Sequence, residues 1–263
     1  MNRKHQRFVS GVGLTAAALV VGCVCTTARA FDNEYLTNAG FEVYEDTVGF
    51  LPDEFGNWQG DQSEILSSTQ DGIVPFEGVE MLQFQGSTMS GADLGTVGSE
   101  VWQLIDISSF VDQVRSGQAV LNASVYFNRV SRDGKGPGDA ETDTQFSVVM
   151  AAYAGTPQDF SAKWISGSQL DGARADLFSD DDTRTWEMAA VKLLLPTNTD
   201  YVAIRIAATE NIMDDWDAPE FDGHYADGSA VWLIPTPGSA ALLFAGCGLG
   251  FGGLSRRRRS TTG

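Results

Sequence analysis

The chain has 263 residues, with 35 acidic residues against 17 basic ones and a formal net charge of −18. A surface of this charge repels nucleic acid and anionic membranes, and it suits calcium, cationic partners or simple solubility. The three cysteines, Cys23, Cys25 and Cys247, all lie in terminal apolar stretches, and His224 is the single histidine after residue 30. These counts exclude disulfide bonds, thiol chemistry and multi-histidine zinc sites from the middle of the chain.

Residues 1–30 have the pattern of a secretory signal peptide. Positively charged residues come first, the mostly apolar run 8–25 follows, and the triplet Ala28-Arg29-Ala30 fits the cleavage site of a signal peptidase. We therefore expect export across the inner membrane and a mature chain that begins at Phe31. An uncleaved N-terminal anchor and a lipoprotein signal with lipid on Cys23 are the alternatives; the triplet soon after the apolar run favours cleavage.

Residues 31–233 are predicted to form one all-β domain, with two small domains as the alternative. In chain order, the composition predicts short strands with loops or turns between them. The predicted strands are 80–85, 100–107, 119–130, 145–153, 183–195, 201–208 and 229–234, and one or two helical turns are predicted in 108–116.

The clearest alternation lies in 119–130. Ala119 to Phe127, at every second position, form an apolar face, whereas Tyr126 and Asn128 belong to the opposite, polar face. In the same way, Val202, Ile204 and Ile206 should point inward and Arg205 outward. Several such strands with little helical periodicity predict an antiparallel β-sandwich of the jelly-roll type.

The order of landmarks resembles the galactose-binding-like jelly-roll family, which includes many carbohydrate-binding modules. The segments that carry the resemblance are Asn38-Ala39-Gly40-Phe41-Glu42, Trp58, Val101-Trp102-Gln103, Asp106-Ile107-Ser108, 117–128, Trp186, 196–208 and Tyr225-Ala226-Asp227. The resemblance covers most of residues 31–233 and implies the same sandwich. Independently of it, we expect Trp58, Trp102 and Trp186 to be core residues rather than parts of a glycan platform.

The family resemblance also implies a site for structural calcium between the first and last strands. Glu42 and Asp227 stand where its carboxylates would come from, with backbone carbonyls completing the oxygen shell. The alternative interpretation is that both carboxylates are solvated or cap turns.

A glycan platform needs an aromatic ring for the face of a sugar and polar side chains for its hydroxyl groups. Tyr126, Asn128 and Arg205 meet this requirement if the two outward strand faces that carry them are shared, and an ordinary exposed sheet face is the alternative. No nucleophile elbow, P-loop or dinucleotide motif occurs in the sequence.

The last stretch, 234–260, has three parts in a fixed order. Pro235-Thr236-Pro237 comes first, the uncharged apolar run 238–254 follows, and Arg256, Arg257, Arg258 and Arg259 complete it. At about 1.5 Å of rise per residue, the apolar run is a short membrane-spanning helix, and the arginines would stay on the cytoplasmic side. A buried C-terminal core helix is the alternative, but a core does not hold such a block of charge.

This tail resembles the PEP-CTERM sorting signal of bacteria that make exopolysaccharide, in which a Pro-Glu-Pro-type motif precedes a membrane span and an arginine cluster. Here Thr236 replaces the usual glutamate. The resemblance implies recognition by an exosortase, cleavage near Pro235 to Pro237, and release or attachment at the cell surface.

Together these patterns predict a secreted, non-catalytic protein of the cell envelope, cell surface or extracellular matrix that contacts polysaccharide. The alternative function is a surface polysaccharide hydrolase or lyase that uses a pair of carboxylates. A deep cleft with two close carboxylates would favour catalysis, and an exposed aromatic on a sheet would favour binding.

Overall fold

The computed structural model describes residues 35–49, 51–67, 72–86, 97–129, 144–180, 182–210 and 223–235. The predicted signal peptide 1–30, the apolar run 238–254 and Arg256 to Arg259 lie outside these residues, as do Thr236 and Pro237. Within the described ranges, no helix has the length and apolar character needed to cross a membrane.

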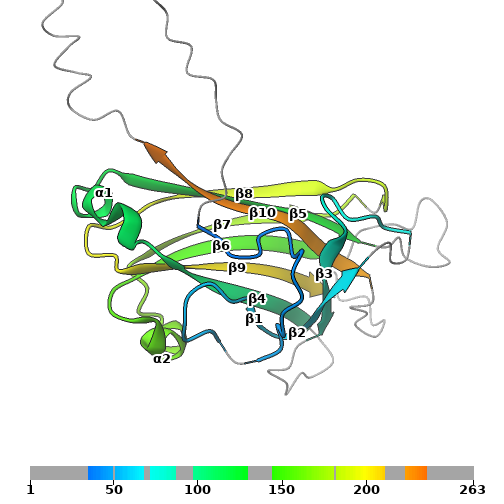
Figure 1. Cartoon of the computed structure of the whole chain (residues 1–263), viewed down its shortest axis with the longest axis horizontal. Helices are drawn as coiled ribbons and strands as arrows, with labels where there is room; N and C mark the ends of the chain where they lie inside the picture. Colours follow the sequence, from blue (N-terminus) through cyan, green and yellow to red (C-terminus); the bar gives the residue numbers. More distant parts are fainter. Residues whose placement is uncertain are drawn as a thin grey trace, which may run out of the picture. The chain divides into compact units, whose positions relative to one another are not determined.

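Two five-stranded sheets form the fold, and the pairings between their named strands are antiparallel (Figure 1). The first, sheet A, has the order β1 (Gln59–Gly60), β4 (Val97–Asp106), β9 (Tyr201–Glu210), β6 (Gln145–Tyr153) and β7 (Asp171–Phe178). The second, sheet B, has the order β2 (Gln62–Ser67), β3 (Glu80–Gly86), β10 (His224–Pro235), β5 (Ala119–Arg129) and β8 (Glu187–Leu194). The predicted antiparallel jelly-roll sandwich is confirmed.

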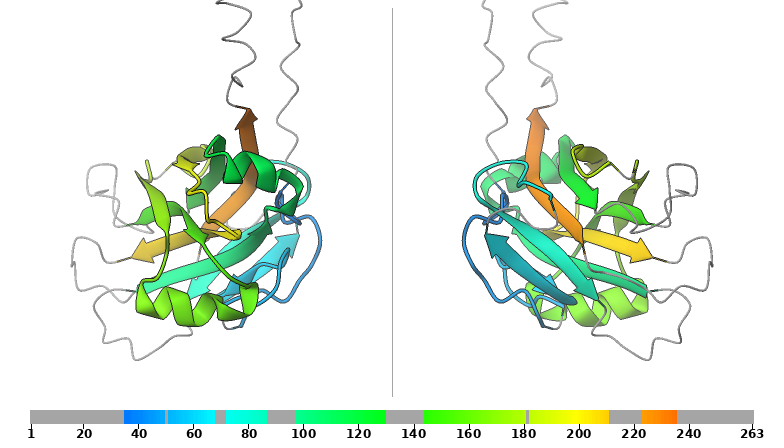
Figure 2. Two further views of the ribbon diagram at one scale, coloured as in Figure 1. Left: turned by 90° about the vertical axis from the view of Figure 1, so that its left-hand side faces the viewer. Right: turned by 90° about the vertical axis from the view of Figure 1, so that its right-hand side faces the viewer.

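Short helices connect some of the strands. The 3-10 turn Ser108–Phe110 and α1 (Val111–Arg115) follow β4, and the 3-10 turn Pro157–Asp159 and α2 (Phe160–Ser166) follow β6. Figure 2 shows α1 and α2 at separate places beside the strands. The two sheets thus account for most of the described secondary structure, and the helical turns expected in 108–116 are present.

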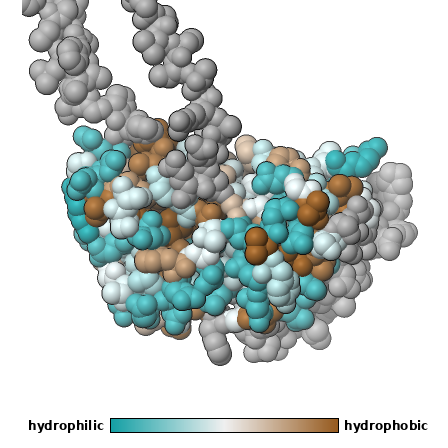
Figure 3. Space-filling model, viewed as in Figure 1, coloured by the Kyte–Doolittle hydropathy of each residue, from teal (hydrophilic) through white to brown (hydrophobic). Residues whose placement is uncertain are grey.

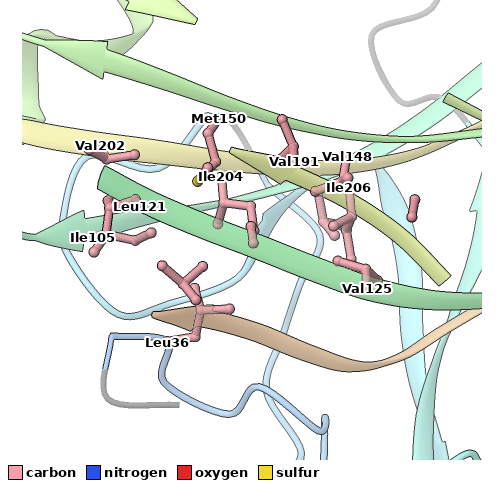
Figure 4. Packing of buried hydrophobic residues seen from close by; sticks show 14 of the residues in the cluster. Leu36, Ile105, Leu121, Val125, Val148, Met150, Val191, Val202, Ile204 and Ile206 are labelled. Carbon is pink, nitrogen blue, oxygen red and sulfur yellow. The ribbon is translucent and has the colours of Figure 1, made fainter. Parts of the chain in front are cut away.

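The main core lies between the inner faces of the two sheets. Leu121 and Val125 from β5 meet Val148 and Met150 from β6, and Ile204 from β9 packs in the same cluster (Figure 4). These positions alternate along their strands, because a strand turns every second side chain to the same face. The predicted inward faces of both 119–127 and 202–208 are therefore confirmed. Trp58 is fully buried in this cluster, whereas Trp102 is fully buried in a second cluster with Phe160 and Tyr201.

The segment Asn38 to Glu42 is a tight loop that connects distant parts of the sandwich. Asn38 and Phe41 adopt positive φ angles of 49° and 54°. The carbonyl of Asn38 accepts the indole N–H of Trp58 at 3.2 Å, and the carbonyl of Ala39 accepts the backbone N–H of Ser229 at 3.0 Å. The landmark that suggested a family resemblance therefore joins the start of the domain to β10.

The last strand extends further than the sequence indicated. β10 begins at His224, five residues before the predicted strand, and ends at Pro235, which lies opposite Ala119 of β5. Proline is compatible with this position because it is the end of the strand. Ile234 ends the predicted strand, and the sandwich also includes Pro235, which is the first residue of the predicted sorting motif.

Candidate functional site: an aromatic ledge on sheet B

Three aromatic side chains meet on the outer face of sheet B. The Phe76 ring stacks on the Tyr126 ring, with centroids 3.7 Å apart and an interplanar angle of 17°. Trp186 meets Phe76 edge to face, with centroids 6.2 Å apart. We call Phe76, Tyr126 and Trp186 the aromatic ledge. Its members come from the loop before β3, from β5 and from the residue before β8, so the fold joins three separate stretches of sequence.

A small apolar cluster lies beside the ledge. Ile73, Met81 and Tyr225 are fully buried there, and Leu66 and Trp186 pack against them. The Trp186 indole N–H donates to the carbonyl of Val74 at 2.9 Å, which ties the start of β8 to the loop that carries Phe76. Trp186 is therefore not part of the main core between the sheets, and the prediction of a core position for it was wrong. An indole with a polar N–H packs readily at such an edge.

The ledge is accessible at its outer side. Phe76 keeps 42% of its surface exposed, whereas Tyr126 and Trp186 are half-buried. Val74 in the same loop and Met188, opposite Tyr126 on β8, are also exposed. Figure 3 shows apolar patches among hydrophilic residues on one face of the molecule. Ring surface at a ledge of this kind is suited to an apolar ligand face.

Asp227 anchors the loop that carries Phe76. Its side chain is fully buried on β10, and its carboxylate accepts the backbone N–H of Glu77 at 3.1 Å and that of Gly228 at 2.7 Å. The backbone N–H of Phe76 is a third donor. Burial raises the pKa of Asp227 to about 7, because desolvation outweighs the three N–H donors that favour the charged form; the nearby charge of Glu77 raises the pKa further.

Glu42 holds the other end of the same loop. Its carboxylate accepts the backbone N–H of Val79 at 3.0 Å and that of Glu80 at 3.3 Å. Unlike Asp227, the Glu42 residue is exposed. The two predicted calcium ligands are therefore both bound to the segment 76–80, at opposite ends of it.

These contacts are a poor fit to a calcium site. Calcium takes six to eight oxygen ligands, whereas the Glu42 and Asp227 carboxylates both face N–H donors. Within the described ranges, no group of three or more His, Cys, Asp or Glu residues is arranged to hold a metal ion. Calcium binding stays a prediction, which thermal unfolding with and without a chelator tests.

The three residues predicted to contact glycan do not share one face. Tyr126 and Asn128 lie on β5 in sheet B, whereas Arg205 lies on β9 in sheet A. Asn128 is buried and its amide group donates to the carbonyl of Thr183 at 3.1 Å. The prediction of a common platform was therefore wrong, because the strands that carry these residues belong to different sheets. Only Tyr126 belongs to the ledge.

Arg205 has structural partners on the outer face of sheet A. Its guanidinium group pairs with the Glu100 carboxylate at 2.7 Å and lies over the rings of Trp102 and Trp164, 5.4 Å and 5.8 Å from their centroids. Trp164 comes from α2, which covers this part of the sheet. The side chain points outward as predicted, but a helix and two indoles surround it.

Sequence reasoning did not identify Phe76, the most exposed ring of the ledge. It lies in Pro75-Phe76-Glu77-Gly78, between β2 and β3. An aromatic residue within a turn-forming Pro/Gly context was the available signal, because loops keep their side chains at the surface.

Solved structures that are similar to part of this chain include carbohydrate-binding modules. TmCBM61, in complex with β-1,4-galactotriose, matches with a TM-score of 0.43 and 12% identity over 76% of this chain and 98% of that one. A CBM22-1 xylan-binding domain of Paenibacillus barcinonensis Xyn10C matches with a TM-score of 0.38 and 12% identity, over 70% and 91%. A cyclase from Fischerella sp. TAU has a TM-score of 0.39 and 12% identity, over 76% and 96%.

No family model matches the chain, and neither does any curated protein. The sequence identities and TM-scores of these solved structures are low. A function for this protein therefore has to be argued from its own residues.

Proposed function

We propose that this protein is a secreted, non-catalytic component of the cell surface or extracellular matrix that contacts glycan through the aromatic ledge. The observation that carries the proposal is the exposed Phe76 ring, stacked on Tyr126 and flanked by Trp186 on an outer sheet face. Sugar rings have an apolar face that packs on aromatic rings, and their hydroxyl groups need polar partners at the rim. Glu77, exposed and next to Phe76 in the chain, is such a partner.

The described carboxyl groups with raised pKa hold loops of the fold and give no support to the alternative, catalytic function. Burial raises the pKa values of Asp227 and Glu45. Asp227 is fully buried on three backbone N–H groups, and Glu45 accepts hydrogen bonds from the Asn38 amide and the Trp58 backbone N–H. A glycosidase needs two carboxyl groups that reach the substrate at a set separation. Both of these groups instead hold loops of the fold.

Replacing Phe76 with alanine tests the glycan proposal. We expect the wild-type domain to bind at least one of a panel of neutral polysaccharides, such as galactan, xylan and glucan, in affinity electrophoresis. Phe76→Ala should bind about tenfold or more weakly, since a stacked ring contributes over 1 kcal/mol to such a contact.

Phe178→Ala is the matched control, because Phe178 is 54% exposed but lies on β7 in the other sheet. It should bind like the wild type. Equal binding by wild type and Phe76→Ala, or no binding to any polysaccharide in the panel, would refute the proposal.

We propose further that a signal peptidase and an exosortase process the two ends of the chain. The order of parts in 1–30 and 234–260 supports this, and the exosortase would act beside the end of β10 at Pro235. The intact mass of the protein recovered from its native host should then match a chain from Phe31 to about Pro235. A mass that retains 238–259 would count against exosortase processing, and so would an unchanged distribution after deletion of Arg256 to Arg259.

A further inference from the structure

The ledge rests on an irregular point in β10. The pairing of β10 with β5 shifts register between Asp227 and Ala230, and Asp227 is the last paired residue before the shift, opposite Tyr126. Gly228 follows with a φ angle of 53°. A bulge of this kind redirects a strand and the side chains beside it. Here the redirected backbone lies directly below the stacked rings of Phe76 and Tyr126.

Gly228 leaves the space that the stack occupies. A Cβ atom on this residue would lie 2.7 Å from Cδ1 of Phe76 and 3.2 Å from Cδ2 of Tyr126. Carbon atoms in contact are normally about 3.5 to 4.0 Å apart, so a side chain at this position forces the Phe76 ring to move. The Phe76 ring can therefore occupy its position only because residue 228 has no side chain.

Asp227 holds the backbone of Phe76, the residue whose ring lies over Gly228. Its carboxylate accepts the N–H groups of Phe76 and Glu77, and these donors belong to a loop 150 residues away in the sequence. The loop has no strand partner of its own at Phe76, so the carboxylate takes the place of a sheet pairing.

We propose that Asp227 and Gly228 are positioning residues for the ligand contact: Asp227 holds the backbone of Phe76, and Gly228 leaves room for its ring. This inference rests on the proposed function for its ligand, although the position of the ring is measurable without one. Neither residue contacts the ligand, since the Asp227 carboxylate is buried under the loop. Their part is to keep the ring oriented before binding, which lowers the entropic cost of the contact.

Gly228→Ala and Gly72→Ala form a matched pair of variants. Both glycines have positive φ angles, 53° and 85°, so alanine introduces backbone strain at each. A Cβ on Gly72 would meet nothing within 4 Å, whereas one on Gly228 would meet the ledge. Nuclear Overhauser contacts between the Phe76 and Tyr126 rings should therefore persist in Gly72→Ala and be lost or weakened in Gly228→Ala. Glycan affinity should fall about tenfold in Gly228→Ala alone.

Substitution of Asp227 separates positioning from general stability. Asp227→Ala should lose more affinity than Asp227→Asn, which keeps one acceptor oxygen for the loop. If Asp227 acts through Phe76, the double variant Phe76→Ala/Asp227→Ala should bind no more weakly than Phe76→Ala alone, a non-additive result that a merely structural role would not produce. All variants are compared at a temperature where each is folded.

The outcomes distinguish this inference from the proposed function. Equal ring contacts and equal affinities in Gly228→Ala and Gly72→Ala would overturn the inference and leave glycan binding intact. Additive losses in the double variant would also overturn it. If the wild type binds no glycan, the proposed function fails, and the ring contacts alone decide whether Gly228 sets the position of Phe76.

Discussion

Phe146→Ala is expected to lower the free energy of unfolding by about 3–5 kcal/mol, the usual cost of removing a fully buried ring. Phe146 on β6 stacks on Phe127 of β5, with centroids 4.7 Å apart and an interplanar angle of 13°. Both rings are fully buried, and they belong to opposite sheets. The substitution therefore leaves a cavity where the two sheets contact each other. Urea unfolding followed by circular dichroism measures the change.

The same substitution at an exposed ring should have a much smaller effect. Phe178→Ala, on the edge strand β7, is expected to change the free energy of unfolding by less than about 1 kcal/mol, since most of the Phe178 surface already faces solvent. Equal losses for Phe146→Ala and Phe178→Ala would contradict the placement of the core between the sheets.

The second large effect is a fall in stability as the pH rises from about 4 to about 7. Burial raises the pKa of Asp227 from 3.8 to about 7 in the folded protein. Between these two values the folded state holds a proton that the unfolded state has released, so the stabilisation is fully present below pH 3.8 and is lost as the pH rises through 7. A difference of about three pKa units corresponds to at most about 4 kcal/mol.

Three other carboxyl groups also have altered pKa values. Two of them affect the stability in a different pH range, and the third acts in the same direction as Asp227. Hydrogen bonds from Arg184 lower the pKa of Asp182, and the Gly155 N–H with Arg115 lowers that of Asp200. Stability from these two groups is present above pH 3.8 and is lost at lower pH. The raised pKa of Glu45 adds to the effect of Asp227.

Asp227→Asn isolates the contribution of Asp227. Because asparagine does not titrate, the variant should lose less stability than the wild type between pH 4.5 and pH 7.5 in urea unfolding. Glu64→Gln on β2 is a control for the change from a carboxylate to an amide, since Glu64 is exposed at a sheet edge. Parallel pH profiles for the wild type and Asp227→Asn would contradict the assignment of a raised pKa to this buried carboxyl group.

Strands with a regular alternation were predictable from the sequence. The ranges 119–130 and 145–153 correspond closely to β5 and β6, because apolar side chains at every second position leave a strand with one stable orientation against a core. The strands that the sequence did not reveal have weaker patterns. β7, in a stretch interpreted as loop, is an edge strand with exposed charges, and β2 has a mixed pattern that reflects its edge position.

The outer faces were harder to predict than the inner one. Tyr201 and Ala203 lie on the outer face of sheet A with Arg205, yet both are fully buried because α2 and its Phe160 cover that face. Alternation tells which residues share a face, but it does not tell whether another element covers it. For the same reason the sequence placed Arg205 and Tyr126 as similar outward residues, although their surroundings differ.

The candidate site was predictable only in part, because it is assembled from three distant segments. Tyr126 and Asp227 were identified, but with different roles and no relation to each other. Their neighbours across the fold, Phe76 and Gly228, depend on the pairing of β10 with β5 and on one positive φ angle. Such long-range relations are set by strand order, which one sequence without structural information does not specify.

The measurement that tests the account most directly is the aromatic side-chain NMR spectrum of the folded domain during titration with neutral oligosaccharides. The account predicts saturable shifts of the Phe76, Tyr126 and Trp186 resonances, with Phe178 unchanged as an internal reference. Shifts confined to residues away from the ledge, or none with any oligosaccharide, would contradict glycan contact through the ledge.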